Sequence, residues 1–422
     1  MRIERWIAAG SEQCCLQRLV VAYNNKAIEG GSYFDKVALN QNKRAVRTGT
    51  YIKQPEDYRA FVPTPLPPNP PIAIDADCWE LLSDADSALA ELNATTALLP
   101  NPDLFVAMFV KKEALLSSQI EGTQASLNDI LRQEAQARRG GQPAAYEEVF
   151  NYVRAMNRGL SRLKELPISL RLIKEIHFEL LNGVRGGNLE PGEFRRSQNW
   201  IGPSGCTLND ASFVPPPPHM VLQCMGDLEK YIHDTKQRMP VLIKTALVHY
   251  QFETIHPFLD GNGRLGRLLI TFLLVWKQRL IRPVLYLSTY FKENKAEYYA
   301  HLQSAREGAL EEWIKFFLRG VVQVSREGAS TAHKIQAMRE KHRSLFQHRR
   351  SATALILLEY LFVQPIVDVQ TVADVVKRSF SVANSLVEQF KDLGLLRETT
   401  GQARNRLFEY TPYVKLFGKL EP

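Results

Sequence analysis

The sequence predicts a mainly α-helical protein with a distinct C-terminal module. Apolar residues recur at helical spacing through most of the chain up to about residue 345, for example in CWELLSDADSALAELNATTALL and SLRLIKEIHFELLNG. One interruption, residues 191–219, is rich in glycine and proline and predicts a β-hairpin with a long tip followed by a polyproline turn. Beyond residue 345 the spacing indicates three short helices and a small hairpin.

The expected elements follow one another in a simple order. Prolines crowd residues 63–71 and indicate a linker. Helices are expected from Cys78 to the loop RRGGQPA, with a break near Gly122, and they resume at YEEVFNYVRAMNRGLSRLKEL. Further helices are expected from Val241 to Leu280 and from Asn294 to about Ser325. The chain is therefore predicted to contain an N-terminal extension and linker (1–60), an N-terminal helical part (61–165), a helical core (166–325) and the C-terminal module (345–422).

The composition is typical of a protein that is neither secreted nor embedded in a membrane. The 422 residues carry a net charge of +8, which permits a polyanionic partner without requiring one. The longest apolar run, LLITFLLVW, is too short to span a bilayer, and the charges in MRIERWIAAG leave no secretory signal. The five cysteines form no C-x-x-C pair and no even framework, which argues against disulfides and structural zinc: Cys14, Cys15, Cys78, Cys206 and Cys224. We expect a cytoplasmic protein.

The stretch HPFLDGNGRLGR at 256–267 contains a literal match to the dinucleotide-binding pattern G-x-G-x-x-G. That pattern requires a preceding strand and an acidic residue about 20 residues later. The preceding TALVHYQFETI has helical spacing, and residues 268–292 contain neither Asp nor Glu. The phosphate-binding G-x-x-x-x-G-K-[ST] pattern and the kinase motifs are also absent. These classes of nucleotide site are therefore excluded.

The same stretch does combine the parts of a phosphate site. Pro257 ends the preceding helix, so His256 lies at its edge and can serve as a base. Gly261 and Gly263 allow a tight turn, and N–H groups at the start of the next helix favour an anion.

Charged residues complete this set. Arg264 and Arg267 are three residues apart on one helix face and offer guanidinium groups to phosphates. Asp260 is an oxygen ligand suited to Mg²⁺ that already carries phosphate oxygens. Each residue alone is compatible with an ordinary turn or a solvated helix, but their combination points to attack on a nucleotide phosphate.

At these positions the sequence resembles the Fic (Fido) family, whose pattern is H-x-F-x-[D/E]-G-N-G-R-x-x-R. The resemblance implies a helical fold and transfer of AMP from ATP, with Mg²⁺, to a Ser, Thr or Tyr hydroxyl of a target protein. It implies that His256 is the general base, Asp260 the metal ligand and Phe258 a packing residue. The implied ATP-binding residues are Gly261, Asn262, Gly263, Arg264, Leu265, Gly266, Arg267 and Asn294.

A second stretch, SSQIEG at 117–122, fits the family's inhibitory pattern [S/T]-x-x-x-E-[G/N] through Ser117, Glu121 and Gly122. On its own it is compatible with an exposed helix end that Gly122 stops. The resemblance implies that the Glu121 carboxylate pairs with Arg267 and takes the cation intended for the γ-phosphate. We therefore expect an autoinhibited enzyme.

The resemblance also implies a β-hairpin flap over the site, formed by Phe194–Ile201 and Ser212–Val214, on which an extended target segment docks. Asn294 and Tyr298 lie where relatives contact the adenosine. The stretch is otherwise compatible with a surface loop. A zinc site is an alternative role for four residues with irregular spacing: Cys206, His219, Cys224 and His233.

The C-terminal module, three helices and a hairpin, predicts a winged helix-turn-helix domain. Its third helix has an apolar face from Val382 to Leu393 and stops at Gly394. Its outward face is polar but hardly basic, whereas Arg397, Arg404 and Arg406 lie in or near the wing. DNA binding and contact with a protein or a second copy of the chain both remain open.

The sequence thus predicts a protein adenylyltransferase that is autoinhibited by Glu121 and able to modify itself. Two alternatives use the same site: a hydrolase that removes AMP from modified proteins, and a nucleotide-sensing regulator that binds DNA through the C-terminal module.

Overall fold

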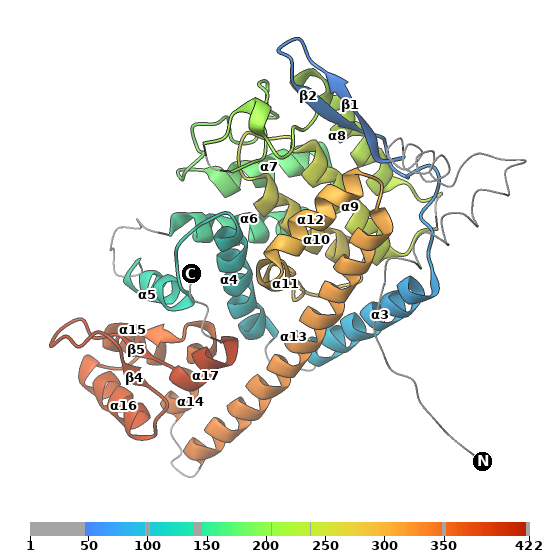
Figure 1. Ribbon diagram of the computed structural model, residues 1–422. Helices are drawn as coiled ribbons and strands as arrows, with labels where there is room; N and C mark the ends of the chain where they lie inside the picture. The colour runs from blue at the N-terminus through green and yellow to red at the C-terminus, as the bar shows by residue number, and fades with distance from the viewer. Residues whose placement is uncertain are drawn as a thin grey trace, which may run out of the picture. The chain divides into compact units, whose positions relative to one another are not determined.

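The computed structural model divides into two units, Met1–Arg44 and Ala45–Pro422. The residues that it describes all lie in the second unit: 47–97, 99, 102–137, 146–203, 205–236, 238–347 and 352–418 (Figure 1). Most of the predicted N-terminal extension, including Cys14 and Cys15, lies outside the described residues.

Two helices joined by the 256–261 turn form the centre of the core. Helix α9 (Val241–Ile255) is buried along nearly its whole length, including polar residues such as His249 and Glu253. Helix α10 (Asn262–Trp276) packs against it, and its residues from Leu265 to Leu274 are buried. Helix α8 (Pro218–His233), which the sequence did not predict, packs on α9 and begins with proline at its first turn.

A second layer of helices packs on α10. Helices α6 (Glu147–Arg162) and α7 (Leu170–Leu181) pack against each other and against α10. Helix α4 (Pro102–Ile120) contacts α6 and α10, and the short helices α5 (Leu127–Ala137) and α11 (Ser288–Glu293) contact α4. The predicted break near Gly122 is present, because Gly122 has a positive φ of 99° just after α4 ends.

The longest helix, α13 (Leu310–Gln347), packs along α3 (Ala76–Ala97) and also contacts α9 and α12 (Lys295–Arg306) (Figure 1). The sequence predicted that this helix ends near Ser325 and that the basic segment KIQAMREKHRSLFQHRR after it is either a linker or a solvated helix. The helix instead continues, because no proline interrupts residues 310–347. Although α13 is long, no helix in the described part of the chain is both long and apolar enough to cross a membrane.

The N-terminal part of this unit contains an unpredicted β-hairpin. Strands β1 (Gly49–Lys53) and β2 (Arg59–Pro63) pair antiparallel where the sequence indicated only an extension and the start of a linker. The predicted hairpin at 191–219 is reduced to a single antiparallel bridge between Ile201 and Phe213, with a 3₁₀ turn, η1 (Leu208–Asp210), near its tip. Its prolines at 215–218 limit further pairing.

The β1–β2 hairpin and the 191–219 segment are in contact. The Phe61 N–H donates to the Val214 carbonyl at 2.9 Å, so the β1–β2 hairpin covers the outer arm of the 191–219 segment. Phe61 and Phe213 rings lie 6.0 Å apart, and the Arg306 guanidinium lies 3.6 Å from the Phe213 ring centre.

The last part of the chain contains the three predicted helices, α14 (Ala352–Val363), α15 (Val369–Val376) and α16 (Phe380–Asp392). The predicted hairpin is formed by β4 (Arg397–Glu398) and β5 (Phe408–Glu409), and a third strand, β3 (Ile366–Val367), extends it in the order β3-β5-β4. Helix α17 (Thr411–Val414) and the turn η2 (Lys415–Phe417) follow, with Phe417 packed edge-on against Phe109 of α4.

Candidate active site

The turn at 256–261 is held in a conformation that few sequences tolerate. His256 caps α9 in the left-handed region with φ 48°, and Gly261 precedes α10 with φ 77°. A Cβ on Gly261 would lie 3.3 Å from His177 Nε2, so both the backbone angle and the close approach require glycine. The turn thereby brings His256 and the N-terminus of α10 together.

Internal hydrogen bonds fix this turn. The Asn262 side chain accepts from the Phe258 N–H at 2.9 Å and donates to the Phe258 carbonyl at 2.8 Å. The sequence had given Asn262 to the α-phosphate, but its buried amide group is engaged within the turn. Its backbone N–H at the start of α10 is also placed to bind an anion.

A buried histidine that the sequence analysis did not single out supports the turn from α7. His177 Nε2 lies 2.9 Å from the Asp260 carbonyl oxygen, its Nδ1 accepts from the Gly192 N–H at 2.8 Å, and its ring stacks on Phe258 at 3.7 Å. Burial lowers the pKa of His177 to about 4, so the ring is neutral near pH 7. This neutral ring links the catalytic turn to the start of the 191–219 segment.

Two residues of that segment hold the His256 backbone. The Arg195 Nε–H donates to the His256 carbonyl at 2.9 Å, and its NH2 group donates to the Pro216 carbonyl at 2.6 Å. The Asn199 amide donates to the Phe258 carbonyl at 2.8 Å. Neither residue was predicted as functional, because their partners are carbonyl groups about 60 residues away that sequence spacing does not reveal.

The His256 side chain is prepared to accept a proton. Burial, together with the positive charges of Arg195 and Arg306, lowers the pKa of His256 to about 4 although Glu121 opposes the change. The imidazole is therefore neutral near pH 7. Its Nδ1 is buried without a hydrogen-bond partner in the described part of the protein.

Arg264 is a buried cation with unused donors. Its side chain is 1% exposed, and none of its three guanidinium nitrogens has a hydrogen-bond partner among the described residues. Carboxylates of Glu148 and Asp260 lie 3.6 and 3.5 Å away, close enough to balance the charge but too far for good hydrogen bonds. Because a buried guanidinium is costly without partners, this arrangement points to an anionic ligand.

Arg267, in contrast, is fully engaged by the end of α4. Its Nε–H donates to Ser117 Oγ at 2.8 Å, and its NH2 group donates to the Ser117 carbonyl at 2.9 Å and to Glu121 Oε1 at 2.7 Å. Burial alone would raise the pKa of Glu121, but Arg267, Arg264 and His256 together lower it. Glu121 is therefore a carboxylate facing this cluster of positive charge.

The Glu121 carboxylate also covers the start of α10. A Cβ on Gly263 would lie 2.3 Å from Glu121 Oε1, so the carboxylate rests against the glycine backbone where a helix N-terminus attracts anions. Ser117 and Glu121 are thus placed as the sequence resemblance implied, and Gly122 ends their helix.

A buried polar network behind α4 was not anticipated. Glu113 of α4 is 2% exposed. Its carboxylate accepts hydrogen bonds from Tyr152 Oη at 3.0 Å, from the Ser288 N–H at 3.3 Å and from Ser288 Oγ at 2.5 Å. Burial raises the pKa of Glu113. The network ties α4 to α6 and α11, and so fixes the helix that carries Ser117.

Asp260 meets the requirements for a Mg²⁺ ligand only in part. Its carboxylate is partly exposed, with Oδ1 accepting from the Gly261 N–H at 2.6 Å. The described residues contain no cluster of three or more His, Cys, Asp or Glu side chains arranged for a metal. A single carboxylate is nevertheless what Mg²⁺ needs when substrate phosphates and water supply its other ligands.

The other residues predicted to bind ATP make contacts within the protein. Leu265 is a core side chain, and Gly266 faces Glu253 of α9, whose Oε1 would lie 2.2 Å from an added Cβ. Asn294 is partly buried and donates to the Tyr290 carbonyl, whereas Tyr298 is buried and hydrogen-bonded to His249. The four residues of the alternative zinc site do not form a metal cluster in the described structure.

Comparison with known proteins agrees with this geometry. Residues 79–161 match the model of the Fic/DOC family N-terminal region, and residues 167–274 match that of the Fic/DOC family. A protein adenylyltransferase Fic from Drosophila grimshawi is 32% identical over 157 residues, which cover 37% of this chain and 29% of that protein. A probable protein adenylyltransferase from Aquifex aeolicus is 30% identical over 206 residues, covering 49% of this chain and 58% of that protein.

The fold has a solved counterpart. A Fic family protein from Desulfovibrio desulfuricans G20 superposes with a TM-score of 0.51 at 19% identity, covering 81% of this chain and 97% of that one. The chain thus spans between about a third and three fifths of the length of its curated relatives, while the structural match covers most of both chains. Residues 79–161 and 167–274, which include the turn at 256–267, are thus similar to the Fic/DOC family, and the solved counterpart shares the fold.

Proposed function

We propose that the protein is a protein adenylyltransferase that transfers AMP from ATP to a Ser, Thr or Tyr hydroxyl of a target protein. The observation that carries the proposal is the buried Arg264 guanidinium without hydrogen-bond partners, beside a helix N-terminus and a neutral histidine. The names of the relatives from Drosophila grimshawi and Aquifex aeolicus support the reaction type.

The residues fit a direct displacement at the α-phosphorus. The N-terminus of α10, Arg264 and Arg267 bind the phosphates, and the neutral His256 accepts the proton of the target hydroxyl. The hydroxyl oxygen forms a bond to the α-phosphorus while the bond to the bridging oxygen of the β-phosphate breaks, and pyrophosphate leaves. Asp260 would hold Mg²⁺ together with the substrate phosphates, and the ion would supply charge neutralisation of the leaving group.

The same proposal includes autoinhibition. In the structure Glu121 holds Arg267 and rests against Gly263, so a γ-phosphate has no access to that cation. ATP would then bind in a pose that does not present the α-phosphorus to His256. Movement of the α4 end, or loss of the Glu121 carboxylate, would free Arg267.

The target is proposed to dock on the inner arm of the 191–219 segment. The outer arm is not available, because Val214 accepts a hydrogen bond from Phe61 of β2. The arm around Ile201 pairs on only one side in the described structure, through Phe213, and its other side can pair with an extended peptide.

For the C-terminal module we propose a winged-helix domain that contacts protein, including a second copy of the chain, rather than DNA. Arg406 is bonded to Asn384 at 3.2 Å and lies 3.5 Å from Glu388, and Arg397 pairs with Glu409. These internal pairs reduce the positive charge that DNA phosphates require. Phe380 and Val382 of α16 are exposed at 57% and 47%, which favours an apolar partner surface.

The reaction type is tested with the Glu121→Gly variant and ATP labelled at either the α- or the γ-phosphate. We expect protein-bound label from α-labelled ATP only, because AMP is transferred and pyrophosphate is released. Equal labelling from γ-labelled ATP would indicate phosphoryl transfer and contradict the proposal. No label from either, with ATP bound and AMP released from premodified protein, would favour the hydrolase.

A further inference from the structure

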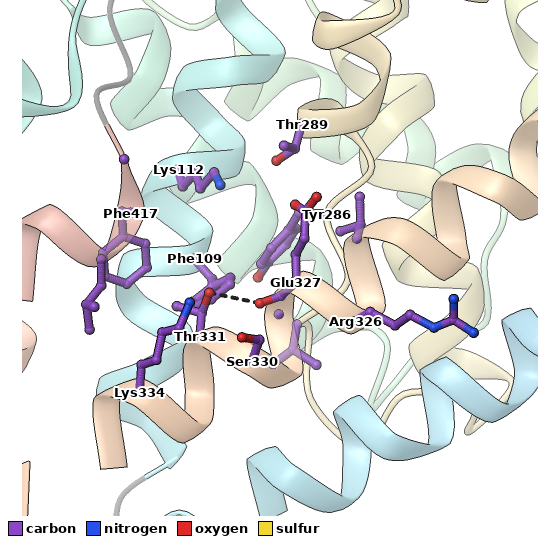
Figure 2. Close-up of a pocket in the computed structure, with 15 residues that line it drawn as sticks. Phe109, Lys112, Tyr286, Thr289, Arg326, Glu327, Ser330, Thr331, Lys334 and Phe417 are labelled. Carbon is purple, nitrogen blue, oxygen red and sulfur yellow. Dashed lines mark hydrogen bonds between the residues drawn. The ribbon is translucent and has the colours of Figure 1, made fainter. Parts of the chain in front are cut away.

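A cavity of about 520 Å³ lies between α4, residues 284–289, α13 and the C-terminal turn η2 (Figure 2). Its volume is within the range of about 300–1,000 Å³ that is common for small-molecule sites. Its lining includes none of the residues assigned to the turn at 256–267 or to Ser117 and Glu121. It is therefore a separate site.

The lining combines an apolar wall with positive charge. Phe109, Val284, Val324 and Phe417 supply the apolar surface. Figure 2 shows Lys112 and Lys334 on either side of Phe109. A third cation, Arg326, is paired with Asp84 at 3.4 Å, and the lining contains one carboxylate, Glu327. The cavity thus has more positive than negative charge.

Lys112 is the innermost of these charges. It is partly buried, and burial lowers its pKa despite the opposing fields of Glu327, Glu293 and Glu113. Within the described part of the chain its ammonium group has no hydrogen bond and no ion pair, whereas the neighbouring Lys111 pairs with Glu134 at 2.6 Å. An ammonium group partly removed from water gains most from a bound anion.

We propose that this cavity binds a small amphipathic organic anion. Its aromatic or aliphatic body lies against Phe109, Val324 and Phe417, and its anionic group contacts Lys112. Hydroxyl groups of Thr289 and Ser330 line the same cavity and can donate to the anion. Lys334, which is exposed on α13, attracts the ligand at the entrance.

The position of the cavity connects it to the inhibitory contact. Lys112 and Glu121 are nine residues apart along α4 and the residue that follows it, a distance of about 13 Å along a helix. Thr289 of the lining follows Ser288, which hydrogen-bonds Glu113 of α4. A bound anion therefore holds α4 in the observed position. Any effect of this on AMP transfer rests on the proposed function, whereas binding of the anion does not.

Calorimetric titration with 2-naphthoate and its neutral analogue 2-naphthamide tests the site. The native protein is expected to bind one naphthoate at least tenfold more tightly than the amide. Lys112→Met keeps the apolar stem and removes the charge, so it should abolish that preference. Ser330→Trp should block binding from the rim, and Lys164→Met, at an exposed lysine outside the lining, should bind as the native protein does.

Equal affinity for the acid and the amide, or unreduced naphthoate binding by both Lys112→Met and Ser330→Trp, would overturn the proposal. Amide hydrogen exchange then tests the connection to α4. Saturating naphthoate should slow exchange in residues 106–121 of the native protein and not of Lys112→Met. Unchanged exchange with bound naphthoate would disprove that connection. Neither measurement uses ATP, so a failure here is separate from a failure of the proposed transferase activity.

Discussion

Arg264 and Arg267 show how two identical side chains in one helix turn differ in function. Arg267 is satisfied by Ser117 and Glu121, whereas Arg264 is buried among carboxylates that do not reach it. The unsatisfied residue is the one prepared for a ligand, because a bound phosphate would supply the hydrogen bonds that the protein does not. Arg267, the satisfied residue, is the one that the proposed inhibition withholds from ATP.

This difference predicts a larger effect of Arg264→Met on ATP binding than on stability. In the Glu121→Gly background it should lower ATP affinity by about tenfold or more, since a charge-assisted hydrogen bond contributes about 1.5–3 kcal/mol. Stability should fall modestly, because no internal hydrogen bond of Arg264 is lost but Glu148 and Asp260 lose the cation that balances their charges. Calorimetric ATP titration and urea unfolding measure both. Unaltered ATP affinity would contradict a role for Arg264 in ATP binding.

His177 is predicted to stabilise the turn without touching substrate. His177→Phe keeps the stacking on Phe258 but leaves the Gly192 N–H and the Asp260 carbonyl without their partner. The free energy of unfolding should fall by about 1–3 kcal/mol for buried groups left unsatisfied. Urea unfolding checks this, with His219→Phe at an exposed position as the control. Equal stability of the two variants would contradict the role given to His177.

At the scale of elements, α4 connects the inhibitory residues to the rest of the fold. Its Glu113 is held by Tyr152 of α6 and by Ser288 of α11, and its Phe109 packs on Phe417 of η2. These contacts hold the position of Ser117 and Glu121 over α10. The proposed inhibition would thus depend on the packing of a helix as well as on one carboxylate.

Tyr152→Phe tests this directly. Loss of the hydroxyl removes a hydrogen bond to Glu113, so α4 is held less firmly and Arg267 is released more often. We expect a several-fold rise in AMP incorporation when Glu121 is intact and no rise in the Glu121→Gly background, where inhibition is already lost. The initial rates of incorporation measure both. An equal rise in the two backgrounds would mean that Tyr152 acts elsewhere.

At the scale of the whole molecule, buried ionisable groups determine how stability depends on pH. Burial lowers the pKa of His249 to about 3 and that of His177 to about 4, while it raises the pKa of Glu253 to about 7. Below about pH 6.5 the two histidines bind protons in the unfolded chain but stay neutral in the folded protein. The free energy of unfolding therefore decreases as pH falls. Glu253 takes up its proton at a higher pH in the folded protein than in the unfolded chain, so it raises the free energy of unfolding as pH falls.

The slope of stability with pH should therefore change in opposite directions in two variants. Between about pH 6.5 and 5, each buried histidine contributes about 1.4 kcal/mol per pH unit. His249→Gln should make the loss of stability on acidification shallower, and Glu253→Gln should make it steeper. Urea unfolding across this range measures the slopes. The same slope in both variants as in the native protein would contradict these pKa values.

Much of this molecule could be predicted from local pattern. The helices that carry the site, the turn that joins α9 to α10, and the break after α4 follow from apolar spacing, proline and glycine. The pairing of Glu121 with Arg267 came from the family resemblance, since no local rule connects residues 146 positions apart. Arg195 and His177 were missed for the same reason: their partners are backbone groups that only the fold brings near.

Other errors have physical causes. The family resemblance implied that Asn262 contacts phosphate; its side chain also bonds Phe258 within the turn, which sequence spacing does not reveal. The 191–219 segment was expected to pair as a hairpin, and its prolines leave one bridge. The β1–β2 hairpin was not expected because its strands are short and partly exposed, and part of its stability comes from contact with Val214.

The central claim is that the Glu121–Arg267 pair holds a competent transferase inactive. The most direct test compares initial rates of AMP incorporation from ATP and Mg²⁺ in the native protein, Glu121→Gly, and Glu121→Gly combined with His256→Ala. We predict little incorporation in the native protein, at least a tenfold rise in the single variant, and loss of that rise in the double variant. Equal rates in the native protein and Glu121→Gly, with ATP bound to both, would contradict the account.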